Sequence, residues 1–274
     1  MSLVLHPATD KLISSIGQDL PQSLLLSGHA GVGLQTIARQ LASSNIAAIL
    51  EPQDAKGETD RTNGTISVEK IRLLYEQTRA KHTRRIFIII DDADRMSPAA
   101  SAAFLKLLEE PNSHVHFILT SHSPDRLLAT IRSRVQRLNV QPVTSEQSTE
   151  FIAALSVTDA KKKSQLLFIA DGLPAELTRL ATDEEYFSKR ATIMSDARDL
   201  LQASAYQKTL IAQKYRGDRA TALQLIDSAM AILRRSISAS AQPKLATQLA
   251  KLLDIREKVA GNRSVLLQLM EFVI

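Results

Sequence analysis

Apolar and polar residues alternate in two different ways along this 274-residue chain. Up to residue 141, short apolar runs that fit β-strands alternate with stretches of helical spacing, a pattern typical of a parallel α/β sheet. The predicted strands cover residues 23–26, 47–50, 85–90, 116–120 and 135–138. After Pro142 no run predicts a strand. The pattern therefore predicts an α/β part followed by an all-helical part.

The helical part has two predicted sections. Residues 143–182 predict three short helices, with Gly172 and Pro174 placed before the last. Longer helices follow from about Asp183, one of them over 219–235 and the next with Leu245, Leu249, Leu252 and Leu253 at helical spacing. The final segment, 264–274, is too apolar for a lone surface helix, so we expect it to be buried in its domain or against a partner. These boundaries predict three domains, at 1–141, 142–184 and 185–274.

The segment after the first predicted strand has the glycine spacing of a phosphate-binding loop. A Walker A loop reads G-x-x-x-x-G-K-[ST] between a strand and a helix. Gly28 and Gly33 keep this spacing, but Leu34 replaces the lysine and Gln35 replaces the serine or threonine. The lysine meets the β- and γ-phosphates and the hydroxyl holds Mg²⁺, and neither replacement can do this. We predict a nucleotide-hydrolase fold whose own site does not hydrolyse ATP; the alternative is a tight strand-to-helix turn without any ligand.

Weak nucleotide binding is compatible with this loop. Gly28, Gly31 and Gly33 can present backbone N–H groups to an anion even without the lysine. We therefore expect no tightly bound cofactor at these three glycines.

A second nucleotide-type feature follows the apolar run Ile86–Ile90. Asp91 comes directly after this run, at the edge of a parallel sheet where ligands bind, and resembles a Walker B acid. Asp92 occupies the position where a working ATPase usually has a glutamate. The alternative, which we favour for Asp92, is that the acids at 91, 92 and 94 cap the next turn and pair with nearby arginines, namely Arg84, Arg85 or Arg95.

The most diagnostic pattern lies between residues 97 and 135. A helix is predicted from Ser97, with Pro98 at its first position, through LLEEP; a strand and a second helix ending at Ser133-Arg134 follow. The stretches AAFLKLLEEPN, FILTSHSPDRLLATIRSR and Ser133-Arg134-Val135 resemble the helix, sensor 1 and S-R-C motifs of the bacterial DNA polymerase III clamp loader, an assembly in the AAA+ family. The resemblance covers residues 24–138 strongly and the helical remainder only in outline. It implies an AAA+ P-loop-type parallel sheet core, a small helical lid and an all-α collar domain that joins subunits.

A P-loop without its lysine and hydroxyl residue, together with the Ser-Arg of the S-R-C motif, resembles the delta-prime type of loader subunit. The gamma/tau motor subunits need an intact G-K-[ST], and delta subunits usually lack the arginine. The resemblance implies a non-hydrolysing stator in which Arg134, with Ser133 beside it, completes the ATP site of a neighbouring subunit as an arginine finger. A planar, permanently charged guanidinium suits contact with phosphate oxygens. The alternative for Arg134, and our expectation for Arg132 and Arg137, is a surface arginine that closes a helix C-terminus.

The resemblance also implies partners: gamma/tau and delta subunits, the sliding clamp, and primed DNA through the complex. Three departures accompany it. The chain has no cysteine, so the four-cysteine zinc module of the family is replaced by a polar loop at 51–65, and we expect no zinc. Val135 stands where the family has the S-R-C cysteine. In the lid, Gly172-Leu173-Pro174-Ala175 is the nearest match to the sensor 2 pattern G-S-x-R, so Ala175 replaces its arginine.

Composition narrows the function classes. The net charge of +5 is mild, no apolar run is long enough to span a bilayer, and no secretory signal pattern is visible, so we expect a cytoplasmic protein without membrane contact. Two rival functions stay open. One is an ATP-hydrolysing gamma-like motor with an unorthodox P-loop, although no alternative lysine lies in the loop. The other is a DNA-binding scaffold that uses basic clusters without interleaved aromatics, namely Arg84, Arg85, Lys161, Lys162 and Lys163.

Overall fold

The computed structural model describes residues 3–17, 19–43, 45–61, 63–79, 82–109, 112–155, 157–239 and 242–273. The chain divides into two compact units, 1–178 and 179–274, and each is described by itself. The boundary between the units falls inside the predicted lid. The division into core, lid and collar stays a prediction.

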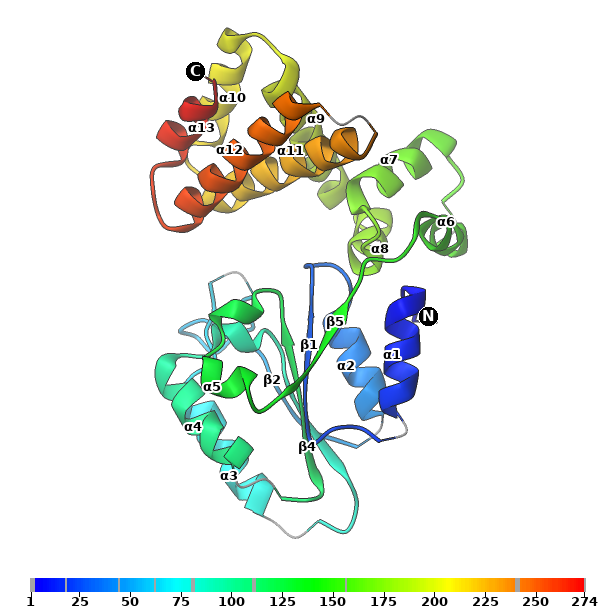
Figure 1. Cartoon of the computed structure of the whole chain (residues 1–274), viewed down its shortest axis with the longest axis vertical. Helices are drawn as coiled ribbons and strands as arrows, with labels where there is room; N and C mark the ends of the chain where they lie inside the picture. The colour runs from blue at the N-terminus through cyan, green and yellow to red at the C-terminus, as the bar shows by residue number, and fades with distance from the viewer. Residues whose placement is uncertain are drawn as a thin grey trace. The chain divides into compact units, whose positions relative to one another are not determined.

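A five-stranded parallel sheet forms the centre of the first unit (Figure 1). The strand order is β2-β3-β4-β1-β5, and all neighbouring strands run parallel. The strands are β1 (Ser23–Gly28), β2 (Ile46–Leu50), β3 (Ile86–Ile90), β4 (Val115–Ser121) and β5 (Gln136–Val140). Each predicted strand is confirmed to within two residues of its ends.

Helices cover both faces of the sheet (Figure 1). One face carries α3 (Val68–Arg79), α4 (Pro98–Glu109) and α5 (Ala129–Arg132); the other carries α1 (Pro7–Gly17) and α2 (Leu34–Ala42). Leu25 of β1 packs toward the first set of helices, while Leu24 and Leu26 pack toward the second. Because both faces are buried, the central strands are continuous apolar runs rather than alternating ones.

Two short turns follow strands of the sheet, and three helices follow β5, the last of which contains the boundary between the two units. The 3₁₀ turns η1 (Ala93–Arg95) and η2 (Pro124–Arg126) follow β3 and β4. The three helices predicted over 143–182 are confirmed as α6 (Ser145–Ala154), α7 (Ala160–Ala170) and α8 (Pro174–Thr182). Helix α6 begins with a capping box between Thr144 and Gln147, which satisfies N–H groups at its free end.

The second unit is helical in all of its described elements. It contains α9 (Glu184–Gln202), α10 (Ala205–Tyr215), α11 (Arg219–Ala239), α12 (Pro243–Ala260) and α13 (Val265–Val273). The predicted burial of the last segment is confirmed for Leu269 and Phe272, which lie in the core of this unit. Of the four leucines expected on one face of α12, Leu252 is fully buried, but Leu253 is 45% exposed because it lies one residue further round the helix.

Candidate functional site

The predicted phosphate-binding loop lies between β1 and α2, as expected. Gly31 and Gly33 have φ angles of 93° and 89°, in the left-handed region that favours glycine. Gly28 lies at the end of β1, where an added Cβ would come within 2.7 Å of the Val140 carbonyl oxygen. The three glycines are therefore required by the backbone path of this loop, whether or not an anion binds there.

The two positions that replace Walker A side chains make contacts within the protein. Leu34 is 2% exposed and belongs to the apolar cluster on the α1 and α2 side of the sheet. The Gln35 Nε2 atom donates a hydrogen bond to Glu51 Oε1 at 2.6 Å. At the neighbouring glycine, the Gly31 carbonyl oxygen accepts a bond from the Ala175 backbone N–H at 2.9 Å. The sensor 2-like segment therefore lies against the loop with a backbone contact and no cationic side chain at Ala175.

Asp91 lies at the C-terminal end of β3, as predicted, and is 3% exposed. Its Oδ1 atom accepts a hydrogen bond from the Thr120 hydroxyl at 2.6 Å, and the same hydroxyl oxygen accepts from the Asp92 backbone N–H at 2.9 Å. Thr120 is in β4, the neighbouring strand, and belongs to the stretch that resembles the sensor 1 motif. This residue thus joins the ends of two adjacent strands at the predicted nucleotide edge.

The partner of Asp91 is Arg61, which sequence analysis did not predict. Arg61 Nη2 lies 2.8 Å from Asp91 Oδ2 and 2.9 Å from Glu51 Oε1. Arg61 belongs to the polar loop at 51–65, which folds back on itself through bridges from Gln53 to Thr59 and Thr65. The only local signal for this contact was an arginine in a long polar loop next to a nucleotide-type strand.

The interpretation that the acids pair with Arg84, Arg85 or Arg95 was wrong for Asp91. Arg84 and Arg85 precede β3, whereas Asp91 follows it, and a strand of five residues spans about 16 Å. The guanidinium of Arg95 points instead to the Gly64 carbonyl oxygen at 3.4 Å. Arg84 and Arg85 are close to Asp91 in the sequence, but they lie at the opposite end of β3.

Asp92 has unfavourable surroundings for a negative charge. Burial, and then the neighbouring charge of Asp91, raise the pKa of Asp92 above its ordinary value. The His122 Nε2 atom is 3.7 Å from Asp92 Oδ1, and this contact is an ion pair only when the imidazole is protonated. Asp92 precedes η1 with a φ of 50°, and its side chain makes no capping bond there, so the favoured interpretation that Asp92 caps this turn was wrong. Glu51 differs: burial opposes its ionisation, but hydrogen bonds from Arg61 and Gln35 lower its pKa overall.

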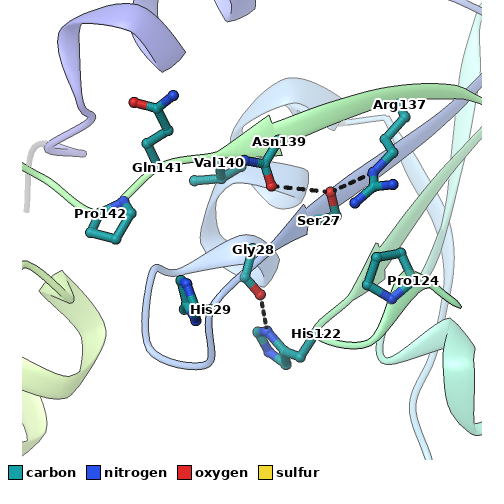
Figure 2. A pocket seen from close by; sticks show the side chains of 10 residues that line it. All are labelled: Ser27, Gly28, His29, His122, Pro124, Arg137, Asn139, Val140, Gln141 and Pro142. Carbon is teal, nitrogen blue, oxygen red and sulfur yellow. Dashed lines mark hydrogen bonds between the residues drawn. The ribbon is translucent and has the colours of Figure 1, made fainter. Parts of the chain in front are cut away.

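A shallow pocket of about 240 Å³ lies beside the loop, at the C-terminal ends of β1 and β5 (Figure 2). The His122 Nδ1 atom lies 2.8 Å from the Gly28 carbonyl oxygen, and since a carbonyl only accepts, this nitrogen is the one that carries hydrogen. Arg137 Nε donates to the Ser27 hydroxyl at 3.1 Å. Arg137 therefore lies within β5, and the expectation that it closes a helix C-terminus was wrong. The lining residues are Ser27, Gly28, His29, His122, Pro124, Arg137, Asn139, Val140, Gln141 and Pro142.

Ser133 and Arg134 follow α5. The Ser133 hydroxyl donates to the Thr130 carbonyl oxygen at 3.1 Å. Arg134 Nη1 donates to the same carbonyl at 3.1 Å, and its Nη2 lies 3.0 Å from Glu109 Oε1 at the end of α4. Glu110 and Pro111, which complete the LLEEP motif, lie outside the described residues. Arg134 thus closes the helix C-terminus and also holds an ion pair that links α4 to the segment after α5.

Arg134 lies at the N-terminal ends of the parallel strands, and Asp91 lies at their C-terminal ends. All strands are parallel, and Arg134 precedes β5, whereas Asp91 follows β3. Gly28 at the start of the loop is paired with Val140, and β5 spans about 13 Å between Gln136 and Val140. Arg134 is therefore separated from this chain's own glycine loop by the length of β5.

Among the residues that the structure describes, no group of three or more His, Asp or Glu side chains could hold a metal ion. No helix in the same residues is long and apolar enough to cross a membrane. Arg84 and Arg85 precede β3, whereas Lys161, Lys162 and Lys163 lie in the first turn of α7.

Comparison with known proteins gives consistent sequence matches. Residues 45–144 match the family model described as DNA polymerase III, delta subunit. The chain is 27% identical over 223 residues to DNA polymerase III subunit delta' of Pseudomonas aeruginosa, covering 72% of this chain and 67% of that protein. It is 28% identical over 211 residues to the delta' subunit of Bacillus subtilis, covering 69% and 63%. The match to a third delta' subunit, of Yersinia pestis, spans about half of that relative, 51%.

The chain is also similar to a related subunit in sequence and to a solved structure in fold. The chain is 30% identical over 155 residues to DNA polymerase III subunit gamma of Buchnera aphidicola from Acyrthosiphon pisum, covering 50% of this chain and 43% of that protein. A solved structure of a Thermotoga maritima RuvB variant superposes with a TM-score of 0.51 at 15% identity, over 67% of this chain and 63% of that chain. At this level of identity the superposition shows the fold alone. It is the AAA+ α/β fold with a helical C-terminal part.

Proposed function

We propose that this chain, which is similar in sequence to DNA polymerase III delta' subunits, is the non-hydrolysing stator of a clamp loader. The proposed partners are the gamma/tau and delta subunits in one hetero-oligomer, and through it the sliding clamp and primed DNA. In this assembly the chain contributes to DNA replication by helping to place the clamp, without turning over ATP itself. We assign to Arg134 the role of an arginine finger in ATP hydrolysis by a neighbouring subunit.

One observation carries this proposal: the placement of Arg134 at the sheet edge opposite the chain's own glycine loop. An arginine in this position is available to a neighbouring subunit and not to Asp91. Its guanidinium can hold two phosphate oxygens with parallel N–H bonds, and it stays charged at all physiological pH values. In phosphoryl transfer such a group stabilises the charge that develops on the transferred phosphate.

The contacts of the chain's own glycine loop also support a chain that does not hydrolyse ATP itself. Leu34 and Gln35 are engaged in protein contacts, and the Asp91 carboxylate is already paired with Arg61. A loop without the lysine cannot stabilise the γ-phosphate, so we assign no catalytic step to it. Ser133 acts at a distance from the phosphate, by fixing the turn from which Arg134 projects.

The test is a reconstituted complex of this chain with its gamma/tau and delta partners. Arg134→Ala should lower the DNA- and clamp-stimulated ATPase without weakening assembly. An arginine finger contributes about 10³–10⁵ in rate in GTPases, but only one interface loses its finger here, so the loss in total turnover will be smaller. Arg134→Lys should restore little, because an ammonium group cannot reproduce the planar fork.

Arg132→Ala is the matched control. The Arg132 and Arg134 side chains are 39% and 40% exposed, and each forms one ion pair, with Asp125 at 2.8 Å and with Glu109 at 3.0 Å. Arg132→Ala should behave like the wild type. Normal clamp loading by the Arg134→Ala complex, or an equal loss with Arg132→Ala, would overturn the assignment of Arg134 as the finger.

A further inference from the structure

We propose that Arg61 is a built-in cation that takes the place of a divalent metal ion at Asp91, so that this edge of the sheet does not bind Mg²⁺. The inference deepens the proposed function, since it explains how a non-hydrolysing chain keeps its Walker B-like acid buried. A working site of this fold presents such an acid to Mg²⁺. The residues present here do not fit that ion.

Both carboxylate oxygens of Asp91 are already in use. Oδ1 accepts the Thr120 hydroxyl at 2.6 Å, and Oδ2 accepts Arg61 Nη2 at 2.8 Å. A buried carboxylate is unfavourable unless it is paired and hydrogen-bonded, and Asp91 has both kinds of contact. A metal ion would have to displace Arg61 to reach Oδ2 and would be repelled by its charge.

The surroundings of Arg61 are built to hold it in this position. The same Nη2 atom lies 2.9 Å from Glu51 Oε1, so one guanidinium serves two carboxylates. Glu51 is held in turn by Gln35 at 2.6 Å and by Thr59 at 3.4 Å. Lys70 Nζ donates to the Glu51 carbonyl oxygen at 2.9 Å. Arg61 therefore ends a network that ties β2, the loop at 51–65 and α3 together.

Gln35 also contributes to the ion pair between Arg61 and Glu51 instead of to a metal site. In a Walker A loop, the residue at this position gives a hydroxyl oxygen to the metal. Here the side chain turns to Glu51, and since a carboxylate only accepts, it is the amide nitrogen that faces Glu51. The position that would supply a metal ligand instead supports the carboxylate that holds Arg61.

A guanidinium differs from a bound metal ion in one functional respect. Mg²⁺ enters and leaves with the nucleotide, whereas Arg61 is part of the chain and cannot lose its charge. The countercharge of Asp91 is therefore constant through any cycle of the neighbouring subunits. This constancy is the property that a stator requires.

The experiment uses the full chain and Mn²⁺ alone as the probe, followed by electron paramagnetic resonance and by thermal unfolding. The wild type should show no Mn²⁺ binding at Asp91 and no change in Tm between EDTA and millimolar Mn²⁺. Arg61→Ala should unfold at a lower temperature in EDTA and should recover part of the loss in Mn²⁺. Its Mn²⁺ affinity should exceed that of the wild type by at least about tenfold, and Asp91→Asn added to Arg61→Ala should remove the gain.

Lys56→Ala is the control, because it removes a cation from the same loop without touching Asp91 or Glu51; it should keep the wild-type Tm and the wild-type response to Mn²⁺. Mn²⁺ binding by the wild type that is lost in Asp91→Asn would overturn the inference, and this measurement does not depend on whether Arg61→Ala folds. Unchanged Tm and Mn²⁺ affinity in Arg61→Ala would also overturn it. Neither result would affect Arg134, whose role is tested separately in the complex.

Discussion

Arg134 and Glu109 form an ion pair with an Nη2–Oε1 distance of 3.0 Å, which joins the segment after α5 to the last residue of α4. The two side chains are 40% and 52% exposed. Exposed pairs of this kind contribute about 0.2–1 kcal/mol to stability. Glu109 therefore restrains Arg134 in the free chain at an energy that contact with a phosphate group readily exceeds.

The variant Glu109→Gln should accordingly leave the fold intact. Its free energy of unfolding in urea should lie within about 1 kcal/mol of the wild type, because a half-exposed pair contributes no more than this. In the reconstituted complex its stimulated ATPase should not fall, since the amide releases Arg134 for the contact that we propose with the ATP site of a neighbouring subunit. A fall as large as that of Arg134→Ala would show that Glu109 positions the finger. Asp125→Asn, which frees Arg132 in the same way, is the control.

The isolated chain should show no ATP hydrolysis above background, and Leu34→Lys should not create any. The substitution restores one Walker A group, but Gln35 still lacks the hydroxyl and Arg61 still holds Asp91. Because Leu34 is 2% exposed within an apolar cluster, the lysine should lower the free energy of unfolding by about 2 kcal/mol or more. Phosphate release by either protein that disappears on Asp91→Ala would contradict this prediction.

Much of the fold could be predicted from periodicity. The five strands were found because a parallel sheet covered on both faces requires unbroken apolar runs, and Ile86–Ile90 is the clearest of them. The glycine loop and Asp91 were found because their places depend only on the order of strand and turn. Such features are local, and they are fixed by a few neighbouring residues.

The contacts of the site could not be predicted in the same way. Arg61 meets Asp91 only because the loop at 51–65 folds back through Gln53, and nothing in the sequence specifies how two residues 30 positions apart are brought together. The expected partners Arg84 and Arg85 could have been excluded from strand length alone, since β3 separates them from Asp91. In helices the burial of a single residue was also mispredicted: Leu253 is exposed, because a shift of one residue changes the face of the helix on which a side chain lies.

The second unit contains a buried hydroxyl whose removal should be measurable. Tyr215 is 4% exposed, and its hydroxyl donates to Asp196 Oδ2 at 2.7 Å, an oxygen that also pairs with Lys214. Burial and the bond to Asp196 raise the pKa of Tyr215 above its ordinary range, so the hydroxyl stays protonated at neutral pH. Tyr215→Phe should lower the free energy of unfolding by about 0.5–1.5 kcal/mol.

Tyr206→Phe provides the comparison for this variant, because Tyr206 is 73% exposed in the same helix, α10. It should change the free energy of unfolding very little. Urea unfolding followed by circular dichroism would measure both variants. Equal effects at the two positions would mean that the bond from Tyr215 to Asp196 contributes nothing net to the stability of this unit.

Asp92 should be a residue that lowers stability at neutral pH. Burial, and then the charge of Asp91, raise its pKa in the folded state above its ordinary value of 3.8. Between these two values the folded state binds more protons than the unfolded state, so stability falls as the pH rises through that window. Asp92→Asn removes the charge, and asparagine tolerates the left-handed backbone found here, with a φ of 50°. The variant should therefore be more stable than the wild type at pH 7.

The pH dependence separates this cause from a change in packing. The advantage of Asp92→Asn should shrink as the pH is lowered from 7 through the raised pKa of Asp92 toward its ordinary value of 3.8, because the wild-type carboxyl then takes up its proton and no longer carries the unfavourable charge. Asp94→Asn is the comparison: its gain at pH 7 should be smaller, because Asp94 Oδ1 accepts a hydrogen bond from the Ser121 hydroxyl and the charge of Asp94 ranks behind burial and Asp91 among the causes that raise the pKa of Asp92. Urea unfolding of the three proteins at several pH values measures both effects. A gain for Asp92→Asn that is the same at all pH values would show that charge at Asp92 is not its cause.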